Sequence, residues 1–402
     1  YVGEEALAAV GVSYSLTTVF ICIAIGGGIG ASVTVSRYFG AKMYKRMKTA
    51  VFTAFIAFLA VSIFLGVFGL VFSKKIIILL NTPSNVIDMA VEYLNIYFLG
   101  LPFLFMYNVV SSMFNALGKS KIPLYFLIFS SVLNIILDIL LVTRFNMGVV
   151  GVAWATFIAQ GISSLLAFAV LLKRVHGIKS GTYKKFSIRM LGHISRIAIP
   201  SILQQSFVSV GNLFIQSRVN SFGSDAVAGS ATGLNFEYFT YFTISAFVQA
   251  AVTFTSQNYG ARNFKRCKKI FVYSMISSVV ICGLMSAIFV VGRDFFAEIY
   301  TTDKAVLEYA SIRMVHVLLF ECLASSYEIG GAALRGLGYS MTPAVLTVLG
   351  SCVFRLIWIY TVFNKFRSFE MLMNVYPVSW IITGIAVLIA YAIVRKKLFK
   401  ET

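Results

Sequence analysis

Six ionisable side chains lie within long apolar stretches of this chain, where charged residues are rare. They are Asp138, Arg218, Glu237, Glu321, Glu328 and Arg355. A charged side chain in hydrocarbon is costly unless it is paired or hydrated, so each is a candidate functional residue. Carboxylates in such surroundings can exchange a proton, or hold Na⁺ together with amide oxygens. These residue types therefore indicate reversible cation binding, although Asp138 and Arg218, toward the outer ends of their stretches, are interpreted as structural.

Three of the acids are the predicted cation-binding residues, namely Glu237, Glu328 and Glu321. Glu237 lies near the middle of its apolar stretch. Glu321 and Glu328 are seven residues apart, which places them two helical turns apart on roughly the same face. The alternative interpretation is a structural ion-pair network, in which Arg355 neutralises one of these acids.

Uncharged polar side chains accompany the ions. Gln205 and Asn212 follow Pro200, whose missing N–H frees a backbone carbonyl and kinks a helix. We predict substrate contacts at Gln205, Asn212, Tyr241 and Arg355. The alternative for such residues, and the commoner one, is hydrogen bonding between packed helices.

No arrangement of catalytic residues accompanies these ions. The three histidines, His176, His193 and His316, lie far apart and show no metal-ligand spacing. The five cysteines form no Cys-x-x-Cys pair, and no nucleophile stands beside a base. The sequence therefore predicts no enzyme, no catalytic residue, no cofactor, and no metal beyond a possible coupling Na⁺.

Two glycine motifs resemble nucleotide-binding sequences only superficially. A phosphate loop has a second glycine five residues before the glycine of its Gly-Lys-Ser sequence. In this chain the residue five positions before Gly118 is Met113, so Gly118-Lys119-Ser120 does not complete that motif. The cluster at 26–30, Gly-Gly-Gly-Ile-Gly, lies inside an apolar stretch rather than after a strand. It predicts close packing of one helix against another.

The composition identifies the surroundings of these residues as a membrane. Of the 402 residues, 59% are hydrophobic and only 12% are charged, whereas a soluble domain has about 25% charged residues. A membrane-crossing helix needs roughly 20 mostly apolar residues. The apolar runs here are long and continuous rather than alternating, which favours helices over a β-barrel and predicts an all-α integral membrane protein.

Eleven such stretches follow one another along the chain. The predicted spans are 8–36, 49–73, 91–117, 123–143, 149–172, 194–221, 226–257, 269–292, 310–334, 343–363 and 375–394. Each boundary is predicted to within a few residues.

Lysine and arginine gather in alternate connections between the spans. The basic connections are 37–48, 119–121, 173–196, 262–269, Arg335 and 395–400, whereas the connections on the other side, with which Arg313 is counted, are nearly neutral. The positive-inside rule places the basic set, and with it the C-terminus, on the cytoplasmic side of the cell membrane. The net charge of +19 is thus a topology signal. Nucleic-acid binding is not expected, because the bases do not line one face.

An internal repeat organises the chain. When the sequence is shifted by 220 residues, Gly3, Ala31 and Gly40 align without a gap on Gly223, Ala251 and Gly260, and 117–123 aligns on 337–343. Each repeat should hold six helices, so both halves cross in the same sense and are related by an axis along the membrane normal. The predicted fold is therefore a twelve-helix transporter fold with eleven spans visible, made of two six-helix lobes related by a pseudo-twofold axis.

The predicted domain boundaries follow from this repeat. An N-terminal lobe covers 1–172, with its first helix missing, because the stretch at 194–221 has no partner in the first half. A cytoplasmic linker covers 173–193, and a C-terminal lobe covers 194–402.

Several motifs resemble a known transporter family. Asn-Ala-Leu-Gly-Lys-Ser at 115–120 and Leu-Asn-Ile-Ile-Leu-Asp at 133–138 resemble the first-half signature of the multidrug and toxic compound extrusion (MATE) transporters. Ala-Leu-Arg-Gly-Leu-Gly at 333–338 resembles the second-half signature, and Thr-Ser-Gln-Asn-Tyr-Gly-Ala at 255–261 also matches. The resemblance covers essentially the whole chain.

The resemblance implies two six-helix lobes, a central cavity, and export of amphipathic, often cationic compounds driven by entry of Na⁺ or H⁺. It also implies a cation site with acids in the seventh, eighth and tenth helices. This chain departs from the pattern at two places. Ala324 stands where one branch carries a tenth-helix acid, and the seventh helix offers Gln204 and Gln205 but no acid.

The predicted function is a monomeric cation-coupled antiporter of small amphipathic compounds in a lipid bilayer. The runner-up is a flippase for lipids or lipid-linked oligosaccharides, which would have a more basic cavity. The six intramembrane ions comprise four acids and two arginines, which favours cationic cargo over that alternative. A more distant alternative, from another class, is a membrane-embedded transferase with a catalytic acid or histidine near an interface.

Overall fold

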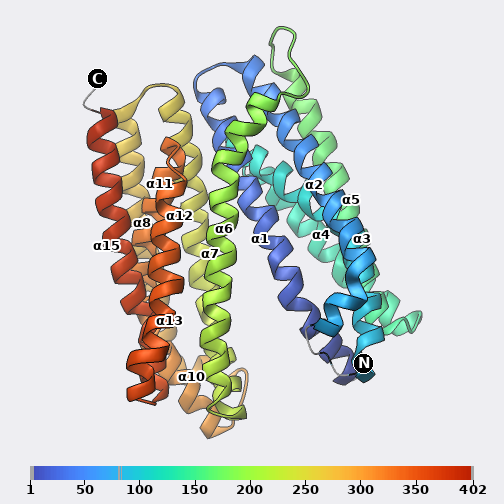
Figure 1. Cartoon of the computed structure of the whole chain (residues 1–402), viewed down its shortest axis with the longest axis vertical. Helices are drawn as coiled ribbons and strands as arrows, with labels where there is room; N and C mark the ends of the chain where they lie inside the picture. The colour runs from blue at the N-terminus through green and yellow to red at the C-terminus, as the bar shows by residue number, and fades with distance from the viewer. Residues whose placement is uncertain (1–3, 80–81, 83, 400–402) are drawn as a thin grey trace. The chain divides into compact units, whose positions relative to one another are not determined.

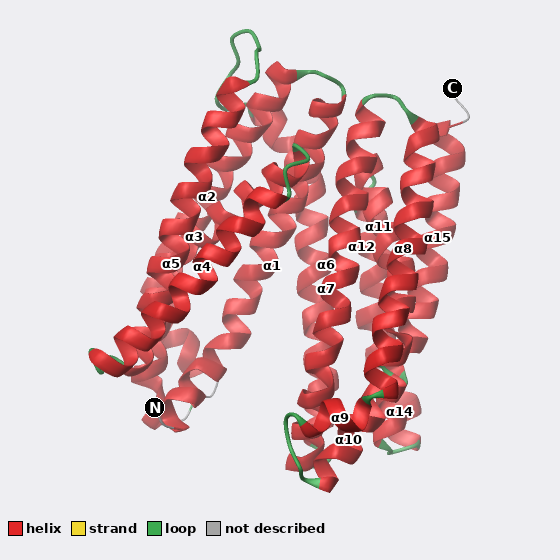
Figure 2. Cartoon of the chain, turned by 180° about the vertical axis from the view of Figure 1, so that it is seen from behind, coloured by secondary structure: helices red, strands yellow, loops and turns green. Residues whose placement is uncertain are grey.

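The fold consists of helices joined by short turns and loops. The computed structural model describes residues 4–79, 82 and 84–399, and within these residues no strand occurs. Figure 2 shows helices throughout this part of the chain. Gly3, which the repeat aligns on Gly223, lies outside the described residues. The predicted all-α class is confirmed.

The chain divides into two compact units, 1–202 and 203–402. The division falls inside one long helix, α6 (Ile188–Asn220), so its beginning belongs to the first unit and its end to the second. The lobe and linker boundaries expected from the sequence stay a prediction.

In the first unit, α3 is the central helix. It packs against α1, α2 and α5 (Figure 1), and its Phe98, Phe105 and Phe114 are fully buried in the apolar core of this unit. The elements before α6 are α1 (Glu4–Gly40), α2 (Tyr44–Leu79), α3 (Ser84–Ala116), α4 (Lys121–Ile139), the π-helical turn η1 (Leu140–Arg144) and α5 (Gly148–Gly177).

In the second unit, the corresponding central segment is broken into three pieces, α10, η2 and α11. The elements after α6 are α7 (Ser224–Gly260), α8 (Phe264–Val291), α9 (Arg293–Glu298), α10 (Lys304–His316), the 3₁₀ segment η2 (Leu318–Leu323), α11 (Ala324–Leu337), α12 (Met341–Thr347), the π-helical η3 (Val348–Val353), α13 (Phe354–Trp358), the π-helical η4 (Ile359–Phe363), α14 (Phe369–Met373) and α15 (Val375–Phe399). The last of the three pieces, α11, packs against α7 and α15.

The backbone repeats at the offset expected from the sequence. Helices α1 and α7 are both 37 residues long, and their first residues, like their last, are 220 positions apart. Lys42 and Arg262, in equivalent turns, both have a φ of 57°. Gly118 and Gly338 both have positive φ, a conformation that favours glycine after a helix. The predicted internal repeat is therefore visible in the local backbone of each unit.

Nine helical stretches in the described residues are long and apolar enough to cross a membrane. Two predicted spans are missing from these nine. The span predicted at 226–257 is one long helix, α7, which holds many polar side chains. The span predicted at 310–334 is not a continuous helix, because η2 interrupts it. Large apolar side chains such as Phe64 and Leu284 remain exposed, as expected for helices that contact lipid.

The glycine cluster of α1 packs closely, as the sequence predicted. A Cβ on Gly30 would lie 2.6 Å from the Cβ and 2.8 Å from the backbone nitrogen of Ala198. A Cβ on Gly26 would lie 2.6 Å from the backbone nitrogen of Ile202. The first part of α6 thus approaches α1 more closely than any residue with a side chain allows.

We expect Gly30→Ala to lower the free energy of unfolding by about 1–3 kcal/mol, because the added methyl group meets backbone atoms that cannot rotate away. The matched control is Gly11→Ala in the same helix, where nothing lies within 4 Å of the added Cβ. Melting temperatures of both variants in detergent test this. Equal melting temperatures for the two variants would contradict the close packing of α1 and α6.

Candidate functional site

A buried ion pair joins α7 to α10 in the second unit. Arg313 Nε donates to Glu237 Oε1 at 2.6 Å, and Nη2 donates to Oε2 at 2.9 Å. Nη1 donates to Ser230 Oγ at 2.7 Å. Glu237 is 7% exposed and Arg313 is 3% exposed. This two-pronged geometry is the strongest form of a charge-assisted hydrogen bond, and it satisfies both ions inside the unit.

This ion pair was not expected from the sequence, because Arg313 was counted with the connections on the outer side of the membrane. The structure instead places Arg313 in the last turn of α10, buried against α7. Gly233 permits the approach, since a Cβ there would lie 3.2 Å from the Arg313 side chain. Glu237 is therefore not the lone acid that its own helix suggested, and its predicted cation-binding role now competes with a structural one.

Glu321 lies in η2, where the central segment is interrupted, and it is buried. Thr240 of α7 donates its hydroxyl to Glu321 Oε2. No lysine, arginine or histidine in the described part of the chain lies within ion-pair distance of this carboxylate. Arg313 interacts with Glu321 electrostatically, but from beyond ion-pair distance. Glu321 thus combines burial with the lack of a directly paired cation among the described residues, the combination expected of a residue that binds an exchangeable cation.

A second polar chain runs from α11 to α6 and α12. Arg335 Nη1 donates to Gln204 Oε1 at 3.1 Å, and Gln204 Nε2 donates to Thr347 Oγ1 at 3.3 Å. Glu328 is half-buried two turns before Arg335 on the same helix, and the two interact electrostatically. Tyr241 of α7 also interacts electrostatically with Glu328. The predicted residues Glu328 and Tyr241 therefore lie near one another.

The remaining predicted substrate residues centre on Arg355 in α13. Its Nη1 donates to Asn212 Oδ1 at 2.6 Å and its Nε donates to Ser379 Oγ at 3.3 Å. Its guanidinium lies 4.6 Å from the ring centroid of Tyr376, and that of Arg313 lies 5.5 Å from the same ring. Among the described residues Arg355 thus forms no ion pair with an acid, so the alternative in which Arg355 pairs directly with one of the glutamates is wrong.

Gln205 lies apart from these contacts. It is half-buried on α6, one residue after Gln204, and its backbone carbonyl accepts a hydrogen bond from Ser209. Arg218, interpreted from the sequence as structural, lies at the end of α6 with its guanidinium 5.7 Å from the ring centroid of Tyr360.

The charge balance of the interior differs from the one expected. Arg335, like Arg313, was assigned to a connection, yet it is buried in the last turn of α11. With these two added, the intramembrane arginines equal the acids in number. The excess of negative charge that favoured a cationic cargo is therefore absent, and that argument is withdrawn.

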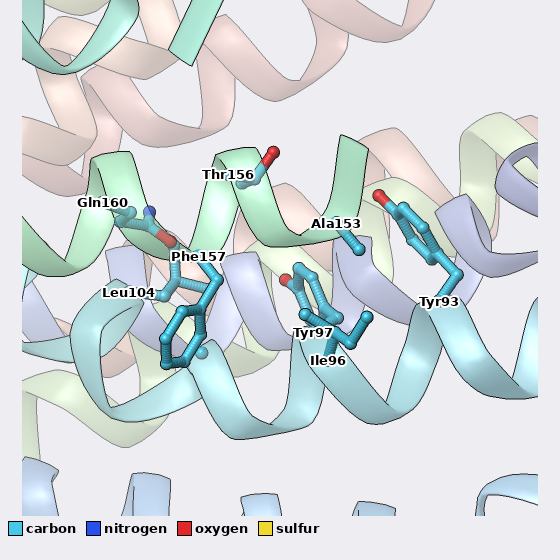
Figure 3. Close-up of a pocket in the computed structure, with 9 residues that line it drawn as sticks. Tyr93, Ile96, Tyr97, Leu104, Ala153, Thr156, Phe157 and Gln160 are labelled. Atoms are coloured by element: carbon cyan, nitrogen blue, oxygen red, sulfur yellow. The ribbon is translucent and has the colours of Figure 1, made fainter. Parts of the chain in front are cut away.

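The first unit contains a separate small pocket between α3 and α5. Figure 3 shows Tyr93 and Tyr97 of α3 together with Thr156, Phe157 and Gln160 of α5 along its wall. Its free volume is about 20 Å³. A single water molecule needs roughly 10–15 Å³ by the same measure, so the pocket has room for a water or a bare monovalent cation and not for a drug-sized compound.

Asp138 of α4, interpreted from the sequence as structural, lies near Tyr93 in the wall of this pocket. Its Oδ1 is buried and has no hydrogen-bond partner in the described residues, and it interacts electrostatically with Tyr93. Asn134, one turn earlier, donates through Nδ2 to Thr156 Oγ1 at 3.4 Å. The four-residue spacing of an amide and an acid on one helix face was visible in the sequence, but nothing there placed α5 opposite it.

Comparison with known proteins gives consistent results. A sequence model of the MatE family matches residues 1–140 and 200–361. The chain is 29% identical over 359 residues to the probable multidrug resistance protein YoeA of Bacillus subtilis, which covers 87% of this chain and 77% of that protein. It is 26% identical over 304 residues to the multidrug export protein MepA of Staphylococcus aureus, which covers 75% of this chain and 67% of that protein.

The fold is similar to solved MATE structures. A crystal structure of MATE in complex with MaL6 superimposes with a TM-score of 0.93, covering 99% of this chain and 90% of that chain at 20% identity. At this identity the likeness bears on the fold alone. It confirms the predicted helical transporter fold.

We expect Glu237→Gln to lower the free energy of unfolding by about 3–5 kcal/mol, because it leaves the Arg313 guanidinium buried without its anion. Adding Arg313→Gln removes both charges and should recover most of the loss. Melting temperatures of the single and double variants in detergent test this. A melting temperature near wild type for Glu237→Gln, together with lost transport, would instead restore Glu237 to the cation-binding set.

Proposed function

We propose that this chain, which belongs to the MATE family of multidrug transporters, exports small amphipathic organic compounds in exchange for entering Na⁺ or H⁺. As a member of this family it is a multi-pass membrane transporter and not an enzyme. YoeA and MepA, by their names, act in multidrug resistance and multidrug export. The coupling to a cation and the class of compound are the parts that we propose.

The observation that carries the coupling is the state of Glu321. An ionised carboxylate that is buried without a positive partner is costly in a low-dielectric interior. It becomes inexpensive when a proton or Na⁺ binds, so the interior of the second unit favours the loaded form. The hydroxyl of Thr240 remains hydrogen-bonded to the carboxylate. Glu321 lies in a 3₁₀ segment, and such mid-helix segments often mark hinges. Loading of the acid can therefore be coupled to a change in the central segment.

Asp138 supports the same proposal from the first unit. Its unpartnered Oδ1, with Asn134 and Thr156 nearby, offers carboxylate, amide and hydroxyl oxygens beside a pocket of ionic size. Oxygen ligands of this kind suit hard cations. Glu328 of the second unit, near Tyr241 and Arg335, is the remaining member of the proposed cation-binding set.

In the proposed cycle, cation and cargo compete for the same charged interior. When Glu321 releases its cation, its negative charge can attract the positive group of a cargo, and when the cation returns, the cargo is displaced. Gln205, Asn212, Tyr241 and Arg355 are the proposed cargo contacts. We place the protein in the cytoplasmic membrane as a monomer, with its basic connections and C-terminus in the cytoplasm, since the positive-inside rule applies to these connections. The flippase alternative is not favoured, because the matched relatives carry multidrug names.

We expect Glu321→Gln to abolish cation-driven efflux while the protein remains folded. Glutamine keeps the volume and the hydrogen bond to Thr240 but cannot ionise, so it removes only the exchangeable charge. The measurement is efflux of a fluorescent organic cation from proteoliposomes, with Na⁺ and pH gradients imposed separately, beside the melting temperature in detergent.

The matched control for this experiment is Glu308→Gln, the same change at an exposed position of α10 in the same unit. It should transport as wild type does. If Glu321→Gln transports at the rate of this control under both gradients, the proposed role of Glu321 is wrong.

We expect Asp138→Asn to reduce efflux at least tenfold under the gradient that drives the wild-type protein, because it removes the carboxylate that interacts with Tyr93 in the wall of the first-unit pocket. Asp88→Asn is the control, since Asp88 is exposed and forms only a surface contact with Lys74. Initial rates in proteoliposomes check both. Unchanged efflux in Asp138→Asn would return Asp138 to the structural role that the sequence suggested.

A further inference from the structure

We propose that Arg355 and Asn212 form a subsite for an acidic group on the exported compound, specifically a carboxylate. This inference rests on the proposed function and names a class of cargo that it leaves open. The preferred cargo is then an amphipathic compound that carries a carboxylate beside its positive group.

The first argument is that no acid in the described residues lies within ion-pair distance of Arg355. Arg355 is 3% exposed, and its described hydrogen bonds go to two neutral oxygens, those of Asn212 and Ser379. Arg313, by contrast, is paired directly with Glu237. The charge of Glu237 acts on Arg355 only from beyond ion-pair distance. A buried guanidinium without an anion is costly, so this position favours an anion that arrives from outside.

The second argument is that Asn212 occupies the place where an anion would bind. Its Oδ1 lies 2.6 Å from Arg355 Nη1, a distance typical of a charge-assisted bond. Unlike Arg355, Asn212 is exposed on α6, so a ligand can reach it. Its amide nitrogen donates no hydrogen bond to the described residues. When a carboxylate displaces Oδ1 from the guanidinium, this nitrogen can turn toward the incoming oxygen.

The third argument is an unused hydroxyl beside the arginine. Ser351 Oγ is buried and has no hydrogen-bond partner among the described residues. Ser351 lies in η3, four residues before Arg355 in the adjoining α13. It also adjoins Gly211, the neighbour of Asn212, where an added Cβ would lie 3.1 Å from the Ser351 carbonyl oxygen. The free hydroxyl therefore belongs to the segment that contacts α6 beside Asn212.

The local backbone fits a binding role for this segment. Arg355 lies in α13, a stretch of five residues with π-helical segments on both sides, η3 and η4. In the first unit, η1 is the equivalent of η4. The residues equivalent to η3 lie within the regular helix α4. Additional π turns in helices are frequent at functional sites. The extra π-helical segment therefore occurs in the unit that carries the arginine.

The test compares two forms of one fluorescent rhodamine, a zwitterion with a free carboxylate and its methyl ester. The vesicles contain only phosphatidylcholine, so that no lipid anion competes for the arginine. We expect wild-type protein to export the acid with a KM at least tenfold lower than that of the ester. Arg355→Gln should bring the ratio of the two KM values close to one, whatever its effect on the absolute rates.

A second variant, Asn212→Asp, avoids the risk that loss of Arg355 unfolds the protein. It places a permanent carboxylate against the guanidinium, so it should keep or raise the melting temperature and remove the preference for the acid. Arg218→Gln, at the end of the same helix α6, is the control and should keep the wild-type ratio.

The outcomes separate this inference from the proposed function. If wild-type protein exports neither compound under Na⁺ or pH gradients, the proposed function fails. If it exports both with equal KM values, or if Asn212→Asp retains the preference for the acid, the anionic subsite is wrong while cation-coupled export stands.

Discussion

The requirement that a charge inside a membrane protein must find a partner organises the second unit. Glu237 and Arg313 meet this requirement fully, because each oxygen of the carboxylate accepts from a different guanidinium nitrogen. Their pairing fixes α10 against α7 and so determines where the interrupted central segment begins. Tyr376 then lies beside both Arg313 and Arg355. The groups without a directly paired group of opposite charge are the ones for which we propose functional roles.

The two repeats share a backbone plan but not an ionic one. Thr17 and Asn108 of the first unit stand at the positions of Glu237 and Glu328 in the second. The first unit therefore builds its centre from aromatic rings on an unbroken α3, and its intramembrane acid, Asp138, lies on α4. The second unit breaks its central segment and places charges on each piece. One fold thus supports two kinds of interior.

The sequence was sufficient for the class, the repeat and the packing of the glycine cluster, because these depend on hydropathy, on a fixed offset and on the absence of side chains. It was insufficient for the pairing of charges. Hydropathy treats an arginine near the end of a span as part of a loop, so Arg313 and Arg335 were counted outside the membrane. The surroundings of Asp138 could not be predicted for a related reason. Tyr93 and Thr156 come near it only through the packing of α3 and α5. Such contacts are three-dimensional, and no spacing along the chain reveals them.

Apart from Arg218 at the end of α6, the intramembrane acids and arginines of the second unit are equal in number, and this balance has an electrical consequence. A membrane potential acts on each elementary charge with about 2.3 kcal/mol per 100 mV. The balance concerns Glu237, Glu321, Glu328, Arg313, Arg335 and Arg355. When all six side chains are ionised their charges sum to zero, so a voltage exerts no net force on them when the unit moves as a rigid body. Binding of one cation makes this sum positive by one charge. Current recorded during turnover would then be carried by the ion and the cargo alone, because these six side chains together move no net charge.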